Sequence, residues 1–270
     1  MPRSARYRRR VAEGDTIHRN ARRLRAALGD GPLVRAEAPS PRSTLRGQPG
    51  RLAALVGRRL ERADAHGKHL FLRFEGGLVL HSHQGMNGSW HTYRPGERWR
   101  KPRSAAWAVL ATERAEAVEF GGTSLVLRTE GELRLDPRLR ALGPDILAPD
   151  LDPRAGARAV RERAPQGATL GEALLDQTVL AGVGNIFKSE GCWRAGIDPW
   201  RRLAEVEDGE LEAVVAATRE LMLAAVERGR APRRVYRAAG RPCPRCGTPI
   251  RSRGQGDTNR TTYWCPGCQR

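Results

Sequence analysis

The sequence lacks long apolar runs, internal repeats and low-complexity tracts. No hydrophobic stretch approaches the roughly 20 residues of a membrane-spanning helix, so we expect no membrane partner. Acidic residues are also few, since 30 Asp and Glu stand against 48 Lys and Arg and leave a net charge of +18. An excess of this size argues for a polyanionic partner and favours nucleic acid. A genome that prefers arginine to lysine explains the choice of cation but not the net charge.

Cysteine is scarce too, because the 270 residues contain five. Four of them form two Cys-x2-Cys pairs, Cys243 with Cys246 and Cys265 with Cys268, separated by 18 residues. Four thiolates at such a spacing are the ligand set of a closed, structural zinc site. Two disulfides are the alternative, but no signal peptide precedes the chain, and we expect a reducing cytoplasm. Cys192, the fifth cysteine, is expected to be buried in a helix.

The segment between the two cysteine pairs is predicted to be a β-hairpin. Residues 250–253 can pair with residues 261–264 across a polar tip at 254–259. A segment this short cannot bury a core of its own, so the metal must hold it together. Arg260 lies where the second strand leaves the tip, and its guanidinium can therefore reach a phosphate.

The first ten residues contain five arginines and no acidic residue. They can be a basic arm, a transit-like segment or untranslated sequence upstream of the true start. A helix is predicted to follow, with Asp15 as its N-cap and Gly29 beyond its end. The apolar positions of this helix are Ile17, Ala21, Leu24 and Leu28.

Residues 33–129 are predicted to form a β-sandwich. The strand-like runs are residues 70–74, 78–80, 106–112 and 123–128. A glycine pair, Gly76 and Gly77, turns the chain between the first two runs. His81 and His83 lie two residues apart and suggest a metal, but no third ligand is evident, and we expect ordinary strand or loop residues.

Two further residues of this region lie outside the predicted strands. Lys68 follows a glycine just ahead of the first strand-like run, and by itself it is an ordinary turn lysine. Met86 lies in a polar loop between glycines, which favours exposure over the burial that methionine normally prefers. An exposed methionine can wedge into a base stack and fill the hole left by a flipped nucleotide.

The remaining chain before the cysteines is predicted to be helical. Residues 131–153 are rich in proline and read as a linker. Residues 169–172 form a capping box that begins one helix, a glycine-rich turn leads into a second, and a long helix covers residues 207–228. Two helices joined by a tight glycine turn form a helix-turn-helix-like pair. The amides of Gly184 and Asn185 open the second helix, where a phosphate is favoured.

Taken in order, these motifs resemble the formamidopyrimidine-DNA glycosylase/endonuclease VIII family, and its endonuclease VIII branch in particular. The resemblance covers nearly everything from residue 12 to residue 270. It is carried by residues 13–19 (Glu-Gly-Asp-Thr-Ile-His-Arg), 67–69 (Gly-Lys-His), 142–145 (Leu-Gly-Pro-Asp), 176–190 and 260–269.

The resemblance implies a multidomain α+β fold. Its expected parts are a basic, untranslated or retained extension (1–11), an N-terminal catalytic β-sandwich domain with a leading helix (12–130), a linker (131–153), a helix–two-turn–helix DNA-binding domain (154–232) and a terminal zinc hairpin (240–270).

The same resemblance implies an enzyme of base excision repair. It would be a bifunctional DNA glycosylase and AP lyase that excises oxidised bases, pyrimidines in this branch, and nicks the abasic site by β,δ-elimination through a Schiff base. Lys68 is implied to assist near the lesion's phosphate, and Arg260 and Asn185 to bind phosphates that flank the lesion. We expect damaged double-stranded DNA as the partner, one structural zinc ion as the cofactor, and a monomer associated with the nucleoid in the cytoplasm.

One position departs from the family pattern. Family members use the terminal amine of a Pro directly before Glu, exposed by loss of the initiator Met, whereas here Ala12 precedes Glu13. An α-amine has a pKa of about 7.7–8.0 against about 10.4 for lysine, so it is the better nucleophile near neutral pH. A start at Val11 and loss of the initiator would leave Ala12 with the free amine and Glu13 beside it as proton carrier.

If residues 1–11 stay attached, other readings open. One is a non-catalytic, zinc-dependent DNA-binding protein, and another is a glycosylase without lyase activity. A third reading, which does not depend on residues 1–11, is a glycosylase limited to single-stranded or abasic substrates.

Overall fold

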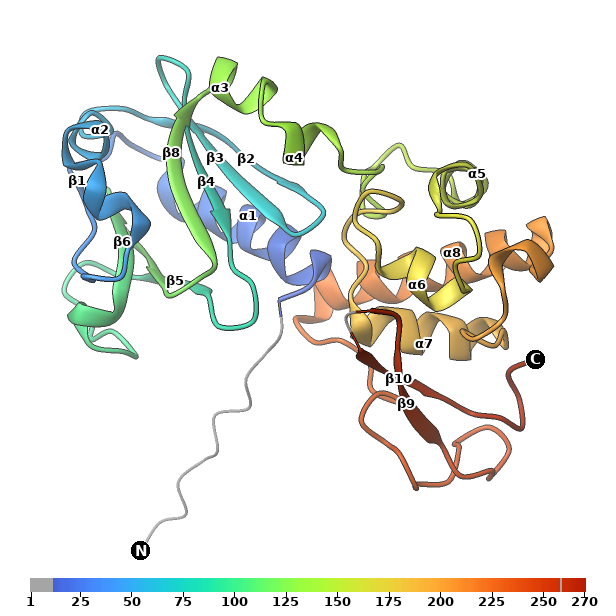
Figure 1. Ribbon diagram of the computed structural model, residues 1–270. Coiled ribbons are helices and arrows are strands. Elements are labelled where there is room, and N and C mark those ends of the chain that lie inside the picture. The colour runs from blue at the N-terminus through green and yellow to red at the C-terminus, as the bar shows by residue number, and fades with distance from the viewer. Residues whose placement is uncertain (1–11, 258) are drawn as a thin grey trace, which may run out of the picture. The chain divides into compact units, whose positions relative to one another are not determined.

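The computed structural model describes residues 12–257 and 259–270 (Figure 1). The predicted extension, residues 1–11, lies outside the described residues. Contacts divide the chain into two compact units, which are described separately: Ala12 with Asn20–Leu135, and Glu13–Arg19 with Asp136–Arg270. No helix in the described ranges is long and apolar enough to cross a membrane.

The first unit is the predicted β-sandwich. Two antiparallel four-stranded sheets, in the orders β1-β6-β7-β5 and β2-β3-β4-β8, form its layers. The strands are β1 Arg35–Glu37, β2 Leu60–His66, β3 His69–Phe74, β4 Leu78–His83, β5 Ser89–Tyr93, β6 Ala106–Ala111, β7 Glu116–Phe120 and β8 Ser124–Thr129. The short helices are η1 Thr44–Gly47, α2 Pro49–Ala53, η2 Arg103–Ala105 and α3 Glu130–Arg134.

The β3–β4 hairpin forms where the sequence predicts it. Leu70 and Leu72 are fully buried because alternate residues of a strand point to the same face. Gly76 and Gly77 turn the chain with φ angles of 76° and 73°. Glycine reaches this left-handed region without a steric penalty.

Two local expectations are wrong. The helix α1 (Gly14–Leu28) begins one residue before Asp15, which therefore lies in its first turn and is not the N-cap. Lys68 directly precedes the strand at residues 70–74 as predicted, but this strand, β3, is not the first of its sheet. Lys68 lies in the turn between β2 and β3, where His66 pairs with His69. The sequence pattern misses β2 because its burial does not alternate cleanly.

The second unit is helical and carries the hairpin. Its elements are α4 Pro137–Arg140, α5 Pro153–Arg163, α6 Leu170–Leu175, α7 Asn185–Ala195, η3 Leu203–Glu205, α8 Asp208–Arg228, β9 Arg251–Gln255 and β10 Arg260–Trp264. The first residues of α1, up to Arg19, also belong to this unit. The capping box at Thr169 opens α6 as predicted, because Thr169 and Glu172 each bond the other's backbone N–H.

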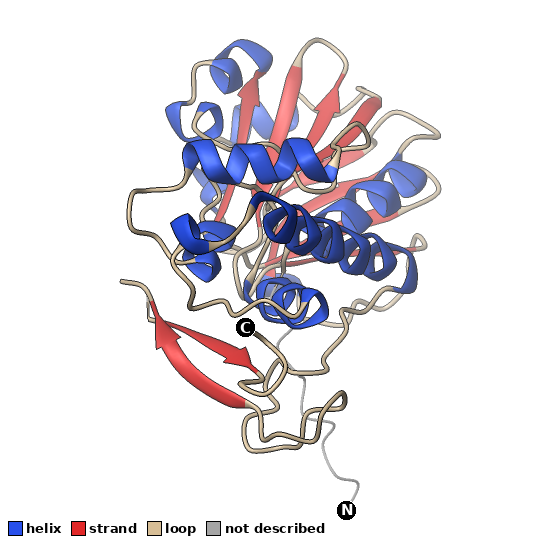
Figure 2. Ribbon diagram, turned by 90° about the vertical axis from the view of Figure 1, so that its right-hand side faces the viewer, coloured by secondary structure: helices blue, strands red, loops and turns tan. Residues whose placement is uncertain are grey.

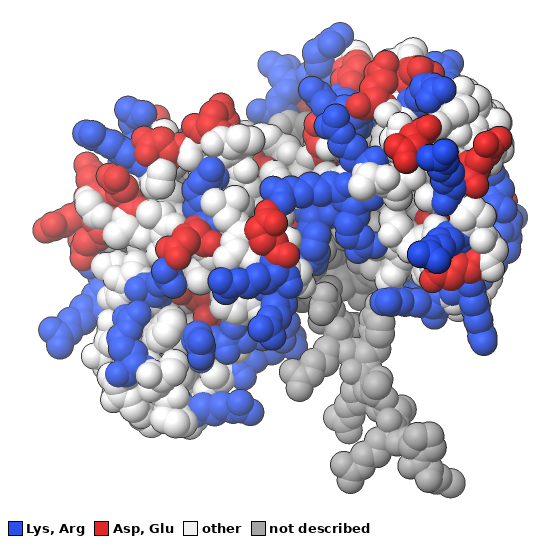
Figure 3. All heavy atoms as spheres, turned by 180° about the vertical axis from the view of Figure 1, so that it is seen from behind, with Lys and Arg blue, Asp and Glu red and all other residues white. Residues whose placement is uncertain are grey.

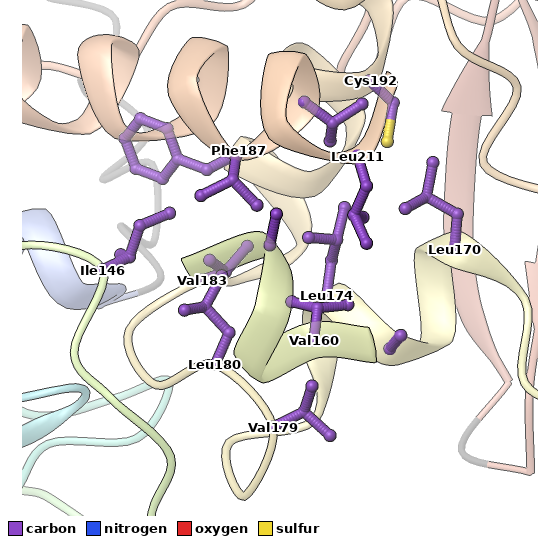
Figure 4. Close-up of a cluster of buried hydrophobic side chains, with 14 of the residues drawn as sticks. Ile146, Val160, Leu170, Leu174, Val179, Leu180, Val183, Phe187, Cys192 and Leu211 are labelled. Carbon is purple, nitrogen blue, oxygen red and sulfur yellow. The ribbon is translucent and has the colours of Figure 1, made fainter. Parts of the chain in front are cut away.

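Apolar side chains from α5, α6, α7 and α8 form one core in this unit (Figure 4). Phe187 and Cys192, both on α7, are fully buried in it. The prediction that Cys192 is a buried helix residue is therefore confirmed.

The predicted linker is partly helical. Residues 131–153 contain most of α3 and all of α4, and Pro137 stands in the first turn of α4. Proline is tolerated there because its missing N–H has no partner within the helix anyway.

The strands of the hairpin are longer than predicted, since Arg251 pairs with Trp264 and Gln255 with Arg260. Both strands therefore reach further toward the tip than predicted (Figure 2).

Candidate functional site

Glu13 is held at the N-terminus of α7. Its carboxylate is buried and accepts hydrogen bonds from the backbone N–H of Ile186, at 2.9 Å, and of Phe187, at 3.3 Å. The open amides and the dipole of a helix N-terminus favour a negative charge there. Gly184 caps this helix, and a Cβ on it would lie 2.2 Å from the Glu13 Cδ atom. The glycine therefore makes room for the carboxylate.

This contact adds an anion that the sequence does not predict. The sequence predicts a phosphate at the amides of Gly184 and Asn185, and the structure places the Glu13 carboxylate on the next two amides, those of Ile186 and Phe187. Local sequence identifies an anion site there. It cannot identify a partner that lies 173 residues away along the chain.

The backbone beside Glu13 is fixed as well. Gly14 N–H donates to the Gly182 carbonyl at 2.9 Å. A Cβ on Gly14 would lie 3.0 Å from the Gly182 Cα atom, and Gly182 has a φ of 101°. Both glycines are thus needed for the close approach. Because Ala12 is bonded to Glu13, these contacts also restrict where the Ala12 nitrogen can lie.

Asn185 and Arg260 are brought together in the second unit. The Asn185 Nδ2 atom donates to the Thr261 carbonyl at 2.7 Å, which joins the first residue of α7 to β10. Arg260 is the residue before Thr261, opens β10 and is exposed. The predicted position of Arg260 at the end of the hairpin tip is confirmed.

Lys68 belongs to the first unit and lies near a group of histidines. His69 on β3 packs beside His81 and His83 on β4, with a 2.9 Å contact between His69 Nδ1 and His81 Nε2. Burial and then the charge of Lys68 lower the pKa of His83, so this ring is neutral near pH 7. His83 is therefore a neutral neighbour of Lys68 and does not repel its positive charge.

Met86 lies in the loop between β4 and β5. Its side chain is 60% exposed, which confirms the exposure predicted from the flanking glycines. A Cβ on Gly88 would lie 2.6 Å from the Gln84 carbonyl oxygen, and one on Gly85 would lie 2.0 Å from Thr123 Oγ1. The glycines let the loop pack closely at its base while the methionine projects.

The four cysteines of the hairpin module meet in one place. Their sulfurs lie within 4.8 Å of one another, with 3.7 Å between Cys243 and Cys268 and 3.4 Å between Cys246 and Cys265. Four ligands at about 2.3 Å around a tetrahedral zinc would be about 3.8 Å apart, whereas a disulfide needs about 2.05 Å. The cluster can hold a metal ion, and Trp193 Nε1 donates to the Cys243 sulfur at 3.4 Å.

Sequence reasoning missed the polar residues that attach this module to α7. Lys188, Ser189 and Glu190 are consecutive and fully buried. The Glu190 carboxylate accepts hydrogen bonds from three backbone N–H groups ahead of the cysteines, those of Arg234, Val235 and Tyr236. Three consecutive polar residues cannot all lie on one exposed helix face, and this was the available signal.

Basic side chains are spread over the surface of each unit on the face seen in Figure 3. This distribution agrees with the formal charge of +18. A surface of this charge attracts polyanions.

Two family descriptions match the chain. The formamidopyrimidine-DNA glycosylase N-terminal domain matches residues 11–138, and the formamidopyrimidine-DNA glycosylase H2TH domain matches residues 142–236. A probable endonuclease 8 2 of Streptomyces coelicolor is 40% identical over 96% of this chain and 94% of that protein. The DNA-(apurinic or apyrimidinic site) lyase Nei2 of Mycolicibacterium smegmatis is 36% identical over 96% and 99%.

Solved structures share the fold. A formamidopyrimidine-DNA glycosylase of Lactococcus lactis, bound non-covalently to DNA that contains an AP site, has a TM-score of 0.81. It is 21% identical, and the match covers 96% of this chain and 100% of that one.

Proposed function

The chain belongs to the formamidopyrimidine-DNA glycosylase/endonuclease VIII family, and on that premise we propose that it is a bifunctional DNA glycosylase and AP lyase of base excision repair. The observation that carries the proposal is the Glu13 carboxylate, buried at the N-terminus of α7 and bonded through the chain to Ala12. The names of its relatives, endonuclease 8 and an apurinic or apyrimidinic site lyase, support this activity. Oxidised pyrimidines are the proposed bases.

Ala12 supplies the nucleophile in this proposal. Near neutral pH an α-amine is uncharged in a much larger fraction of molecules than an ordinary lysine, because its pKa is about 7.7–8.0 against about 10.4. Its nitrogen attacks C1′ of the flipped nucleotide, and the damaged base leaves with the electron pair of the glycosidic bond. The sugar ring then opens to a Schiff base as its ring oxygen takes a proton.

Glu13 carries protons for these steps. It lies next to Ala12 in the chain, so its carboxyl group can deliver the proton to the ring oxygen. It can then accept protons during the eliminations that follow. β-Elimination removes a proton from C2′ and expels the 3′ phosphate, and δ-elimination expels the 5′ phosphate.

The DNA contacts are divided between the two units. In the second unit Asn185 and Arg260 bind phosphates that flank the lesion, a role supported by the bond that joins α7 to β10. In the first unit Lys68 assists near the lesion's phosphate, and Met86 fills the space left by the flipped base. The proposed partner is damaged duplex DNA, bound by a monomer at the nucleoid in the cytoplasm.

The proposed cofactor is one structural zinc ion, held by Cys243, Cys246, Cys265 and Cys268. The sulfur separations and the all-thiolate donor set favour zinc. A closed site of four protein ligands leaves no position for substrate. The ion therefore holds the hairpin, and through it Arg260, without taking part in the reaction.

The active form is proposed to begin at Ala12. In the 270-residue chain the Ala12 nitrogen is an amide, which cannot form an imine. The match to the family's N-terminal domain begins at residue 11, which supports a start at Val11 followed by removal of the initiator. A non-catalytic DNA-binding protein remains the competing proposal for the longer form.

Borohydride trapping on abasic DNA tests the proposal. Protein beginning at Ala12 should form a covalent complex, and the 270-residue form should trap at least about a hundredfold less, because its Ala12 nitrogen is not basic. Glu13→Gln should abolish base excision in either form. Equal trapping by both forms would instead assign the nucleophile to a lysine, with Lys68 the first to be tested.

A further inference from the structure

Lys188 is a buried cation between the helix that binds Glu13 and the hairpin that carries Arg260. The side chain is fully buried. Its Nζ atom donates to Thr262 Oγ1 on β10 and to Gln255 Oε1 on β9, the latter at 3.3 Å. Both partners are neutral.

Lys188 makes no ion pair with any carboxylate in the described parts of the chain. A buried ammonium without an opposite charge is costly, and proteins normally pair it or leave it neutral. Burial accordingly lowers its pKa to about 8. The charged and titratable groups that act on it, besides its neutral partners, are Cys192, Glu13, Arg260 and Glu172.

These neighbours do not neutralise the ammonium. Glu13 and Glu172 favour the charged form, and Arg260 opposes it. The Cys192 thiol stays neutral because burial raises its pKa to about 12. The Glu13 carboxylate is already hydrogen-bonded to the amides of α7.

The position of Lys188 points toward the proposed phosphate site. It lies one helical turn after Asn185 on the same helix. Its partner Thr262 follows Thr261, whose carbonyl Asn185 binds, and lies two residues after Arg260. The lysine is therefore directly behind the two residues proposed to bind phosphate, but it is too buried to touch the ligand.

We propose that Lys188 is a positioning residue whose missing counter-ion is the DNA phosphate bound by Asn185 and Arg260. This inference rests on the proposed function of those two residues. The ammonium acts on the phosphate through the protein interior, where charges are poorly screened. DNA binding and protonation of Lys188 are thus coupled.

The coupling has a definite sign. A bound phosphate favours the ammonium, so binding takes up a proton wherever free Lys188 is partly neutral. Below pH 8 the lysine is already charged, and affinity should not depend on its titration. Above pH 8 the dissociation constant should rise by up to about tenfold per pH unit.

The test measures binding to duplex DNA that contains a tetrahydrofuran abasic analogue, which cannot form an imine. Dissociation constants are compared between pH 6.5 and 9.5 at fixed ionic strength. We expect Lys188→Met to bind about tenfold more weakly at pH 7 and to lose the rise above pH 8. Lys188→Arg, whose charge does not titrate in this range, should keep the affinity and also lose the rise.

Folding of the variants separates this role from a purely structural one. In Lys188→Met the Gln255 oxygen keeps the Thr262 hydroxyl as donor, at 2.6 Å. The melting temperature of this variant at pH 7 should therefore be no lower than that of the wild type. If Lys188→Met does not fold, the wild type is compared with Lys188→Arg. The same dependence of the dissociation constant on pH in these two proteins would overturn the proposal.

Arg260→Ala distinguishes failure of this inference from failure of the proposed function. A loss of affinity in Arg260→Ala with none in Lys188→Met would reject the role of Lys188 alone. Unchanged affinity in Arg260→Ala would reject the phosphate site itself.

Discussion

The two units position their proposed DNA contacts in different ways. In the β-sandwich, Lys68 and Met86 lie in short connections between strands that are consecutive in the chain, and nearby glycines shape both loops. In the helical unit, Glu13, Asn185 and Arg260 are positioned by polar contacts between distant segments. The carboxylate reaches α7 across 173 residues, and Asn185 reaches β10 across 76. A substitution in the first unit should therefore affect its own loop, whereas a substitution in the second unit should also affect the distant segment that it contacts.

Removal of the metal should give the largest effect. The hairpin buries few apolar side chains, since its cluster consists of Val235, Ala238, Ile250 and two of the cysteines, with Trp193 of α7 packed against them. Without the ion the module should unfold and release Arg260, with a loss of DNA affinity of at least about a hundredfold. Titration of lesion DNA into chelator-treated protein measures this.

Cysteine variants supply the matched control for the metal experiment. Cys246→Ala should lose both the metal and the affinity. Cys192→Ala should keep both, because Cys192 lies in the helical core and outside the sulfur cluster. Full affinity in protein shown by metal analysis to be empty would contradict a structural role of the ion.

The difference between local contacts and contacts across the chain also explains which features the sequence could predict. The β3–β4 hairpin, the capping box at Thr169 and the exposed Met86 depend on residues that are close in the chain. Spacing, turn chemistry and flanking glycines were enough to place them. The cysteine cluster is an exception. It was predicted although its two pairs are not close in the chain, because four thiolates at that spacing have few other uses.

The features that were missed depend on tertiary contacts. Glu190 binds backbone amides that begin 44 residues further along, and no local pattern marks such a partner. Lys188 is fully buried and bonded to the hairpin, which lies more than 60 residues further along the chain. The Glu13 carboxylate in the first turn of α7 was missed for the same reason, because it comes from a residue 173 positions away.

Met86→Ala should give a smaller and more selective effect. Loss of the wedge should reduce excision from duplex DNA about tenfold and leave excision from single-stranded DNA nearly unchanged, since a single strand has no stack to hold open. Leu135→Ala is the matched control, because Leu135 is 76% exposed at the end of α3 and is assigned no role. Equal losses on both substrates would make Met86 a packing residue.

The smallest effect on DNA affinity should come from Glu119, a buried group that offers a direct comparison with Lys188. Glu119 lies on β7 and is fully buried, with Oε1 accepting a hydrogen bond from Ser82 Oγ at 2.7 Å. Its Oε2 atom has no partner within the described ranges. Burial raises the pKa of this carboxyl to about 8, so it is protonated at neutral pH. Unlike Lys188, it has no proposed DNA contact beside it.

The two groups should therefore differ in what their removal changes. The folded-state pKa of Glu119 lies above its unfolded value, so the sandwich has its full stability below about pH 4.5 and loses stability as the pH rises toward 8. Glu119→Gln removes this dependence, and its melting temperature should exceed that of the wild type by a margin that grows between pH 5 and 8. The corresponding difference in unfolding free energy is at most about 4 kcal/mol. DNA affinity should not change at any pH in this range, because the carboxyl is neutral and no phosphate depends on it. Melting temperatures that depend on pH in the same way in both proteins would show that Glu119 is ionised in the folded protein. A change in DNA affinity in Glu119→Gln would show that this buried carboxyl also affects DNA binding.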